Sequence, residues 1–189
     1  QAYSTMLTEV PSEIGQLSNL RSLSLNSNQL TRLPPEIGQL SNLNYLDVRD
    51  NQIQEFPGEI GQLQNLDNLI ASDNQLRGLP REIGGLASLR SLKLENNNIA
   101  VLPSSIGQLR NLMYLYVQNN QLIALPADIG GCMTLQYFNL QNNRLRLLPP
   151  EIGQLVSLRE IPLYGNRLEA LPPEIGKLIR LRELRLADN

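Results

Sequence analysis

A step of 23 residues governs this sequence along its whole length. The stretch 43–61, LNYLDVRDNQIQEFPGEIG, contains the pattern L-x-x-L-x-L-x-x-N-x-L, filled by Leu43, Leu46, Val48, Asn51 and Ile53. The pattern returns without insertions, and its Ile-Gly pair recurs at Ile14, Ile37, Ile60, Ile83, Ile106, Ile129, Ile152 and Ile175. A fixed period of this kind predicts a solenoid, in which each repeat buries its apolar face only against its neighbours.

One asparagine in each repeat keeps the same step. It stands at Asn28, Asn51, Asn74, Asn97, Asn120, Asn143, Asn166 and Asn189. These positions fall where the chain leaves the predicted strand and its backbone groups would be buried between coils. An asparagine amide offers both donors and an acceptor to such groups. We therefore predict a structural asparagine ladder with no role in binding.

The 23-residue form L-P-x-x-I-G-x-L resembles the leucine-rich-repeat superfamily over essentially the whole chain. Within it, the form is similar to the Ras-group repeats and to repeats of bacterial proteins, some of them exported. The resemblance implies an α/β solenoid: a curved horseshoe with a parallel sheet on the concave face and short helical or 3-10 turns on the convex face. It also implies protein–protein recognition through the inner face, as in scaffolds that bind small GTPases, in plant intracellular relatives and in signalling adaptors of polarised cells.

The residues themselves favour the same architecture. The apolar residues of the L-x-L segments point inward, and successive segments stack side by side as parallel strands. The apolar residues of the return segment 33–43 fall three or four apart, which suits a short helical turn. Pro34 and Pro35 fit the start of that turn, and Glu36 fits the positive end of its dipole. Because strands stack more closely than helices, the sheet is expected on the inside of the curve.

We predict a single repeat domain over residues 1–189. It comprises a partial repeat at 1–19, full repeats that start at 20, 43, 66, 89, 112, 135 and 158, and a partial repeat at 181–189. Thr5 and Ala2 replace the expected asparagine and leucine, so the first strand is degenerate. No polar capping segment follows the last repeat, which would expose Leu184 and a strand edge. We expect the parent protein to continue, or this end to pack against another chain.

Composition excludes several classes of function. The net charge of -2 argues against a dedicated nucleic-acid binder. The chain has no histidine, which excludes Ser-His, Cys-His and His-metal sites, and it has no phosphate-binding glycine motif. Asp47, Asp50 and Asp73 could in principle gather around Ca²⁺, but no loop is present to wrap an ion. We therefore expect no catalysis, no metal and no cofactor.

The one cysteine, Cys132, stands where other repeats have leucine, so we interpret it as a small buried residue. With one cysteine, no intramolecular disulfide can form, and the chain has no N-x-Ser/Thr sequon. Both features favour a cytoplasmic location, with a secreted or cell-surface bacterial setting as the alternative. No apolar run approaches the length of a membrane span.

Comparing the repeats with one another separates constant from variable positions. The return segments barely change, whereas three outward-facing strand columns change freely, and they hold five of the six tyrosines. Tyrosine is enriched in binding hot spots, although it also simply favours strands. The predicted partner-binding residues are Tyr45, Asp47, Arg49, Ile70, Asp73, Lys93, Glu95, Tyr114, Tyr116, Gln118, Tyr137, Asn139, Tyr164 and Arg185. We expect Tyr114, Tyr116 and Tyr137 to form the central aromatic patch, and Ile70 to be exposed beside it.

The leading hypothesis is a non-enzymatic module that binds another protein on its concave sheet. By family resemblance alone, that partner could be a small GTPase or another signalling protein. The first alternative is a structural, engineered or excised repeat scaffold that self-associates through uncapped ends. The second alternative is a glycan or small-ligand binder, which an open sheet suits poorly.

Overall fold

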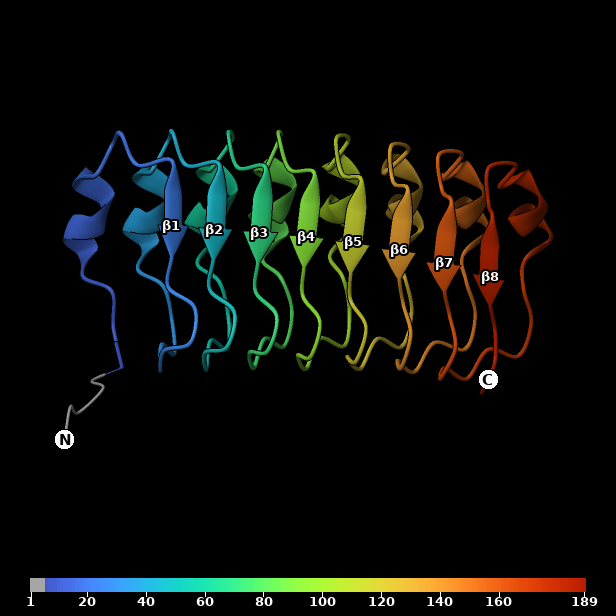
Figure 1. The fold of residues 1–189 in the computed structure, drawn as a ribbon. Helices are drawn as coiled ribbons and strands as arrows, with labels where there is room; N and C mark the ends of the chain where they lie inside the picture. Colours follow the sequence, from blue (N-terminus) through green and yellow to red (C-terminus); the bar gives the residue numbers. More distant parts are fainter. Residues whose placement is uncertain (1–5) are drawn as a thin grey trace.

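The computed structural model describes residues 6–189, so the expectation of a degenerate strand at Ala2 and Thr5 lies outside the described residues. Each repeat contributes one short strand and one 3-10 helix, which alternate along the chain (Figure 1). The strands are β1 (Ser22–Ser24), β2 (Tyr45–Asp47), β3 (Asn68–Ile70), β4 (Ser91–Lys93), β5 (Tyr114–Tyr116), β6 (Tyr137–Asn139), β7 (Glu160–Pro162) and β8 (Glu183–Arg185). The helices are η1 (Ser12–Gln16), η2 (Pro35–Gln39), η3 (Gly58–Gln62), η4 (Arg81–Gly85), η5 (Ser104–Gln108), η6 (Ala127–Gly131), η7 (Pro150–Gln154) and η8 (Pro173–Lys177).

The strands form one open parallel sheet in chain order, β1 to β8, as predicted. The register advances by one repeat at each step, so that Tyr45 lies beside Asn68 and Leu46 beside Leu69. Between β6 and β7 the paired register shrinks to Tyr137 and Glu160. The cause is Pro162, which has no backbone N–H to donate to the neighbouring strand.

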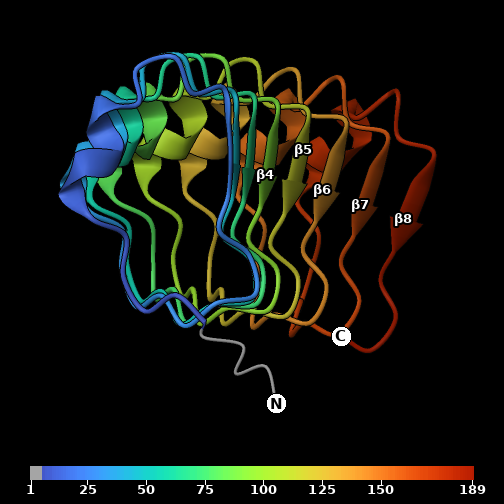
Figure 2. The same ribbon diagram turned by 60° about the vertical axis from the view of Figure 1, so that its left-hand side comes forward.

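The 3-10 helices cover the opposite side of the core from the strands (Figures 1 and 2). Each begins after a proline in extended conformation, such as Pro34 at φ -70° and ψ 148°, and Pro35 occupies the first turn beside Glu36. Each is closed by a backbone N–H, as when Leu40 donates to the carbonyl of Ile37 at 3.2 Å. The fixed φ of proline suits such a start, and the five-residue length keeps the turn short.

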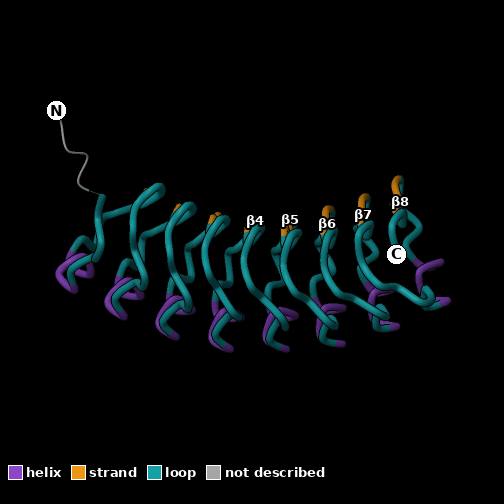
Figure 3. Tube along the Cα trace, turned by 90° about the horizontal axis from the view of Figure 1, so that it is seen from below, coloured by secondary structure: helices purple, strands orange, loops and turns teal. Residues whose placement is uncertain are grey.

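The core runs between the strands and the helices as one continuous cluster. Leu46 and Val48 from the strand side and Ile60 and Leu63 from the helix side are all fully buried. The prediction that the L-x-L residues point inward is confirmed. Figure 3 shows the solenoid bent into an arc with the strands on the inner side and the helices on the outer side, as expected for the wider helical layer.

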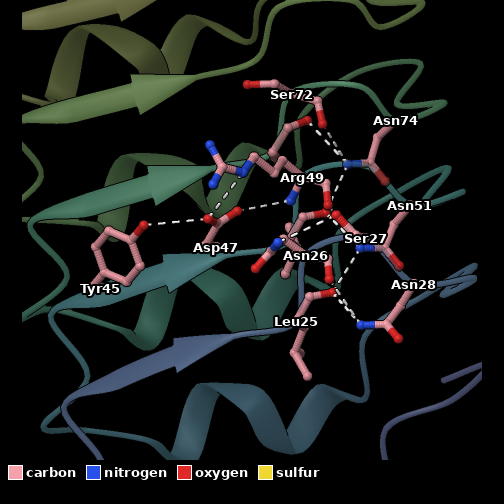
Figure 4. Close-up of polar contacts among 12 residues, drawn as sticks. Leu25, Asn26, Ser27, Asn28, Tyr45, Asp47, Arg49, Asn51, Ser72 and Asn74 are labelled. Carbon is pink, nitrogen blue, oxygen red and sulfur yellow. Dashed lines mark hydrogen bonds and ion pairs between the residues drawn. The ribbon is translucent and has the colours of Figure 1, made fainter. Parts of the chain in front are cut away.

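The recurring asparagine binds the backbone of two adjacent repeats (Figure 4). Asn51 donates through Nδ2 to the carbonyl of Val48 in its own repeat at 3.0 Å and of Leu25 in the preceding repeat at 2.9 Å. Its Oδ1 accepts from the backbone N–H of Leu30, also in the preceding repeat, at 2.9 Å. Equivalent bonds recur through Asn189, so the predicted structural ladder is confirmed.

The residue before this asparagine has a left-handed backbone in every repeat, with φ between 53° and 57° at Ser27, Asp50, Asp73, Asn96, Asn119, Asn142 and Asp188. Asparagine and aspartate tolerate this conformation better than most residues do. Their side chains also join across repeats: Asn142 donates to Asn119, Asn119 to Asn96 and Asn96 to Asp73, at 2.7–2.8 Å. Gly165 takes the left-handed position in the next repeat, at φ 68°.

Candidate functional site: the concave sheet

Strands β5 and β6 carry an aromatic cluster, defined here as Tyr114, Tyr116 and Tyr137, at the middle of the concave sheet. Tyr114 and Tyr137 are register partners on β5 and β6. The rings of Tyr116 and Tyr137 have centroids 5.1 Å apart and are tilted by 39°. Tyr114 is exposed at 39%, whereas the other two are half-buried. The predicted grouping of these three tyrosines is thus seen in the structure.

A cation already lies against this cluster. Lys93 Nζ on β4 is 5.4 Å from the centroid of the Tyr116 ring. That distance is within the range of cation–π attraction, in which an ammonium group is held by the negative face of an aromatic ring. The aromatic cluster therefore offers a surface that attracts positive charge.

The environment of the aromatic cluster disfavours ionised phenols. Burial raises the pKa of Tyr116 above its usual 10.0, and the neighbouring Tyr137, Glu95, Tyr114 and Glu160 raise it further. Burial also raises the pKa of Tyr137, against the hydrogen bond from Asn139, which lowers it. The phenols of Tyr116 and Tyr137 thus stay neutral at physiological pH and present hydroxyl groups that can donate and accept.

Two tyrosines are held by a polar residue two positions further along the same strand. The Tyr45 hydroxyl donates to Asp47 Oδ2 at 3.3 Å, and Asp47 also accepts the Arg49 backbone N–H at 3.1 Å and pairs with Arg49 Nε at 3.3 Å (Figure 4). Asn139 repeats this arrangement by donating to Tyr137 Oη at 3.2 Å. Asp47 and Asn139 are only 2% and 5% exposed, so they position their neighbours and present little surface themselves.

The expectation that Ile70 is exposed is wrong, because its exposed fraction is 9%. Ile70 points out of the core on β3, but it lies between the register partners Asp47 and Lys93. The inward curve of the sheet crowds these outward columns together and covers the smaller side chains.

Some of the remaining predicted residues lie beside the aromatic cluster, and others lie further along the solenoid. Glu95, Gln118 and Tyr164 follow β4, β5 and β7 in the same outward column, and Arg185 on β8 forms an ion pair with Glu183 at 2.8 Å. Asp73 does not lie on a strand. It stands in the left-handed turn after β3, where its carboxylate accepts the amide of Asn96, so the structure separates it from the aromatic cluster.

The comparison of the repeats with one another missed two features of the concave sheet and its surroundings. Glu160 is the register partner of Tyr137, so it lies beside the aromatic cluster. The sequence could have indicated this, because Glu160 follows Tyr114 and Tyr137 at the same repeat position. The second feature is an exposed apolar stripe on the edge of the solenoid, formed by Val101, Ile123 and Leu147, with exposed fractions of 53%, 56% and 59%. Val101 and Leu147 share a repeat position with Arg32, Glu55 and Gly78, and Ile123 lies at the preceding repeat position, shared with Thr31, Gln54 and Arg77. These two positions are polar or glycine up to Gly78, a contrast that the sequence contains.

Other kinds of site find no support among residues 6–189. This part of the chain holds no group of three or more histidine, cysteine, aspartate or glutamate residues that could bind a metal ion. Cys132 is fully buried, its Sγ lies 3.2 Å from the carbonyl oxygen of Ile106, and burial raises its pKa to about 12. Within the same residues, no helix is both long and apolar enough to cross a membrane.

The structure is an open, curved solenoid with an aromatic cluster on its accessible sheet. This architecture places the protein in the class of repeat scaffolds. Residues 7–77 and 70–135 match a leucine-rich repeat region, and residues 134–155 match a single leucine-rich repeat. The chain therefore belongs to the leucine-rich-repeat family, whose members are generally non-enzymatic binding scaffolds. No curated protein is similar enough to this chain to count as a match.

Several solved structures share the fold. A leucine-rich-repeat protein of Leptospira interrogans is 42% identical, with a TM-score of 0.91, over 96% of this chain and 46% of that protein. The plant peptide hormone receptor RGFR1, in complex with RGF2, is 34% identical, with a TM-score of 0.82, over 95% of this chain and 34% of the receptor. An internalin of Listeria monocytogenes is 25% identical, with a TM-score of 0.76, over 92% and 49% respectively. This chain thus spans less than half the length of each of these proteins.

Proposed function

We propose that this chain is a non-enzymatic protein-binding module that holds its partner on the concave sheet. The aromatic cluster carries the proposal, because it places three large, stiff, amphipathic side chains together on the most variable face of the molecule. Tyrosines combine apolar contact with a polar tip and lose little rotamer entropy on binding. The similarity to a peptide hormone receptor determined with its peptide supports the same assignment.

The identity of the partner is a separate question from the face that binds it. A small GTPase or another signalling protein is one candidate, offered by the resemblance of the repeats to Ras-group sequences. The test must therefore identify the partner and locate its binding face in the same experiment.

We would use the intact chain, the variant Tyr114→Ala/Tyr116→Ala/Tyr137→Ala and the edge variant Val101→Ser/Ile123→Ser/Leu147→Ser as baits in lysate, and identify captured proteins by mass spectrometry. A partner held by the intact chain and the edge variant, but lost by the tyrosine variant, is the expected result. Truncating one central tyrosine should cost about 2 kcal/mol or more of binding, which is about thirty-fold in Kd.

Circular dichroism of all three baits separates loss of binding from loss of folding. A partner that the folded tyrosine variant still captures, while the edge variant does not, would move the function to the apolar stripe. Equal capture by all three baits would remove both surfaces from consideration.

A further inference from the structure

Two carboxylates flank the aromatic cluster from opposite sides. Glu160 on β7 is the register partner of Tyr137 on β6. Glu95 follows Lys93, and Lys93 is the register partner of Tyr116. Both carboxylates lie close enough to the Tyr116 phenol to raise its pKa. The aromatic cluster therefore lies between two negative groups.

These two carboxylates and the ammonium of Lys93 are the unpaired charges beside the aromatic cluster. Arg49 pairs with Asp47 at 3.3 Å, and Arg185 pairs with Glu183 at 2.8 Å. Within residues 6–189, neither Glu95 nor Glu160 has a basic nitrogen within 4.0 Å, and Lys93 has no carboxylate oxygen within that distance. When the paired residues are excluded, two carboxylates and one ammonium remain. The surface beside the tyrosines therefore has an excess of negative charge.

Two acceptor atoms beside the aromatic cluster lack donors. In the described part of the chain, Glu95 Oε2 and Gln118 Oε1 are buried without a hydrogen-bond partner. The two residues occupy the same outward column on adjacent strands, so their side chains are neighbours. Buried acceptors of this kind are costly when unpaired, and a ligand that brings N–H donors removes the cost.

The position of Lys93 shows which kind of donor the rings accept. Its ammonium lies over the face of Tyr116, so a cation fits there sterically and electrostatically. A guanidinium fits the whole arrangement better than an ammonium, because its plane stacks on aromatic rings while its five N–H groups reach acceptors at its edge.

We propose that the aromatic cluster, together with Glu95, Gln118 and Glu160, binds an arginine side chain presented by the partner. The guanidinium stacks on Tyr116 and Tyr137, and the Glu95 and Gln118 side chains turn so that their orphaned oxygens accept its N–H groups. Glu160 supplies the second negative charge. Lys93 competes for the same ring face. This inference rests on the proposed function, and it specifies a partner whose docking segment is basic.

Short end-blocked Gly/Ser peptides that carry two arginines are the probes, with citrulline, lysine and glutamate versions for comparison. Binding is followed by isothermal titration and by tyrosine fluorescence, which is unobscured because the chain has no tryptophan. We expect saturable binding of the arginine peptide in the millimolar range, weaker binding of the lysine peptide, and none of the citrulline or glutamate peptides. An arginine peptide that fails to bind, or binds no better than citrulline, overturns the proposal.

Matched variants then locate the binding. Glu95→Gln and Glu160→Gln should each weaken arginine-peptide binding about five-fold, which corresponds to one charge-assisted contact. Lys93→Gln should strengthen binding, because it removes the competing cation, whereas a partner of acidic chemistry would lose affinity. Glu55→Gln, at an exposed position on the edge, is the control and should bind as the wild type does. Titrations of Glu95→Gln and Glu160→Gln that match the wild type overturn the proposal.

Failure of this inference is distinguishable from failure of the proposed function. If a lysate partner is lost by the folded tyrosine variant but retained by Glu95→Gln and Glu160→Gln, the concave face binds it without an arginine anchor. If the folded tyrosine variant retains every captured protein, the concave face itself is not the binding site.

Discussion

Single asparagines hold consecutive repeats together because each one serves several buried backbone groups. Asn97 accepts the Leu76 N–H at 2.9 Å and donates to the carbonyls of Ala71 at 2.9 Å and Leu94 at 3.0 Å. No other side chain of similar size offers two donors and an acceptor in this arrangement. The asparagine is therefore required by backbone satisfaction and not by contact with a ligand.

Asn97→Ala should lower the free energy of unfolding by about 2 kcal/mol or more, because it leaves buried backbone donors and acceptors without partners. Urea unfolding followed by circular dichroism measures the change. Asn98→Ala is the neighbouring control: Asn98 is exposed and accepts only the Gln121 amide at 3.2 Å, so its loss should stay within about 0.5 kcal/mol. Equal losses in the two variants would contradict the structural role of the ladder.

Cys132 should resist alkylation in the folded protein. Burial raises its pKa to about 12, so at pH 8 the reactive thiolate is scarce, and the sulfur has no exposed surface. Iodoacetamide followed by mass spectrometry should label the chain in guanidinium and leave it unlabelled in buffer. Rapid labelling of the native chain would show that the thiol is accessible.

The raised pKa of Cys132 also makes the stability of the protein depend on pH. The thiol of the unfolded chain ionises near its ordinary pKa, so the unfolded state binds fewer protons than the folded state once the pH exceeds about 9. The contribution of Cys132 to stability is thus present below pH 9 and is lost as the pH rises towards 12. Cys132→Leu should lose less stability over that range.

At the residue scale, the sequence predicted which positions face inward and which asparagines are structural, because both follow from the 23-residue period. It did not predict the burial of Ile70, Asp47 and Asn139, which all occupy outward positions. Their burial depends on the curvature of the sheet and on the size of side chains in adjacent strands. Neither quantity is contained in one repeat alone.

At the element scale, the convex side depends on close stacking of the 3-10 helices. A Cβ added at Gly107 in η5 would collide with the backbone carbonyl of Asp128 in η6. The Ile-Gly pair therefore marks a place where one helix lies directly against the next. The period revealed this glycine, but only the structure gives the reason for it.

Gly107→Ala should destabilise the fold by more than about 1 kcal/mol, because the colliding atom belongs to backbone and cannot rotate away. Gly176→Ala in η8 makes the same chemical change where an added Cβ meets nothing within 4 Å, and it should stay within about 0.5 kcal/mol of the wild type. Thermal unfolding of the two variants in parallel checks this contrast. A stable Gly107→Ala protein would mean that η5 and η6 can separate at little cost.

Pro162 shows the limit of element prediction from pattern. The L-x-L pattern predicts β7 correctly, but the missing N–H of Pro162 reduces its register with β6 to one pair. The strand remains in the sheet because Ile161 within it and Leu163 directly after it are fully buried. Apolar burial outweighs the loss of one backbone bond at this position.

At the scale of the whole molecule, the fold is a stack in which each repeat touches only its neighbours. Removing residues 43–65 joins Asn42 to Leu66 and keeps the period intact. We expect this shortened protein to fold, with a urea m-value smaller by about one-eighth, since 23 of 189 residues are lost. Circular dichroism and urea titration test this expectation.

Removing only residues 43–54 is the matched comparison, because it breaks the period and places polar residues at core positions. That variant should fail to fold cooperatively. If the chain without residues 43–54 folded cooperatively, or the chain without residues 43–65 failed to fold, the repeats would not contribute to stability as interchangeable units.

The overall architecture was predictable because one short pattern, repeated at a fixed step, specifies strand, turn and helix together. The candidate site was predictable only in part. The outward columns and their tyrosines could be found by comparing repeats, but ring packing, ion pairing and the orphaned acceptors depend on side-chain positions across strands. Chemistry that arises between repeats has no signature within any one of them.

The direction of the asparagine bonds has a consequence for synthesis on the ribosome. Each asparagine completes backbone groups that emerged earlier: Asn51 receives the N–H of Leu30, which lies 21 residues before it. A coil that has left the exit tunnel therefore stays unfinished until the next one follows. At about 5–20 residues per second, that delay is about 1 to 4 seconds. The nascent chain should lock one coil behind its growing end, from the N-terminal side onward.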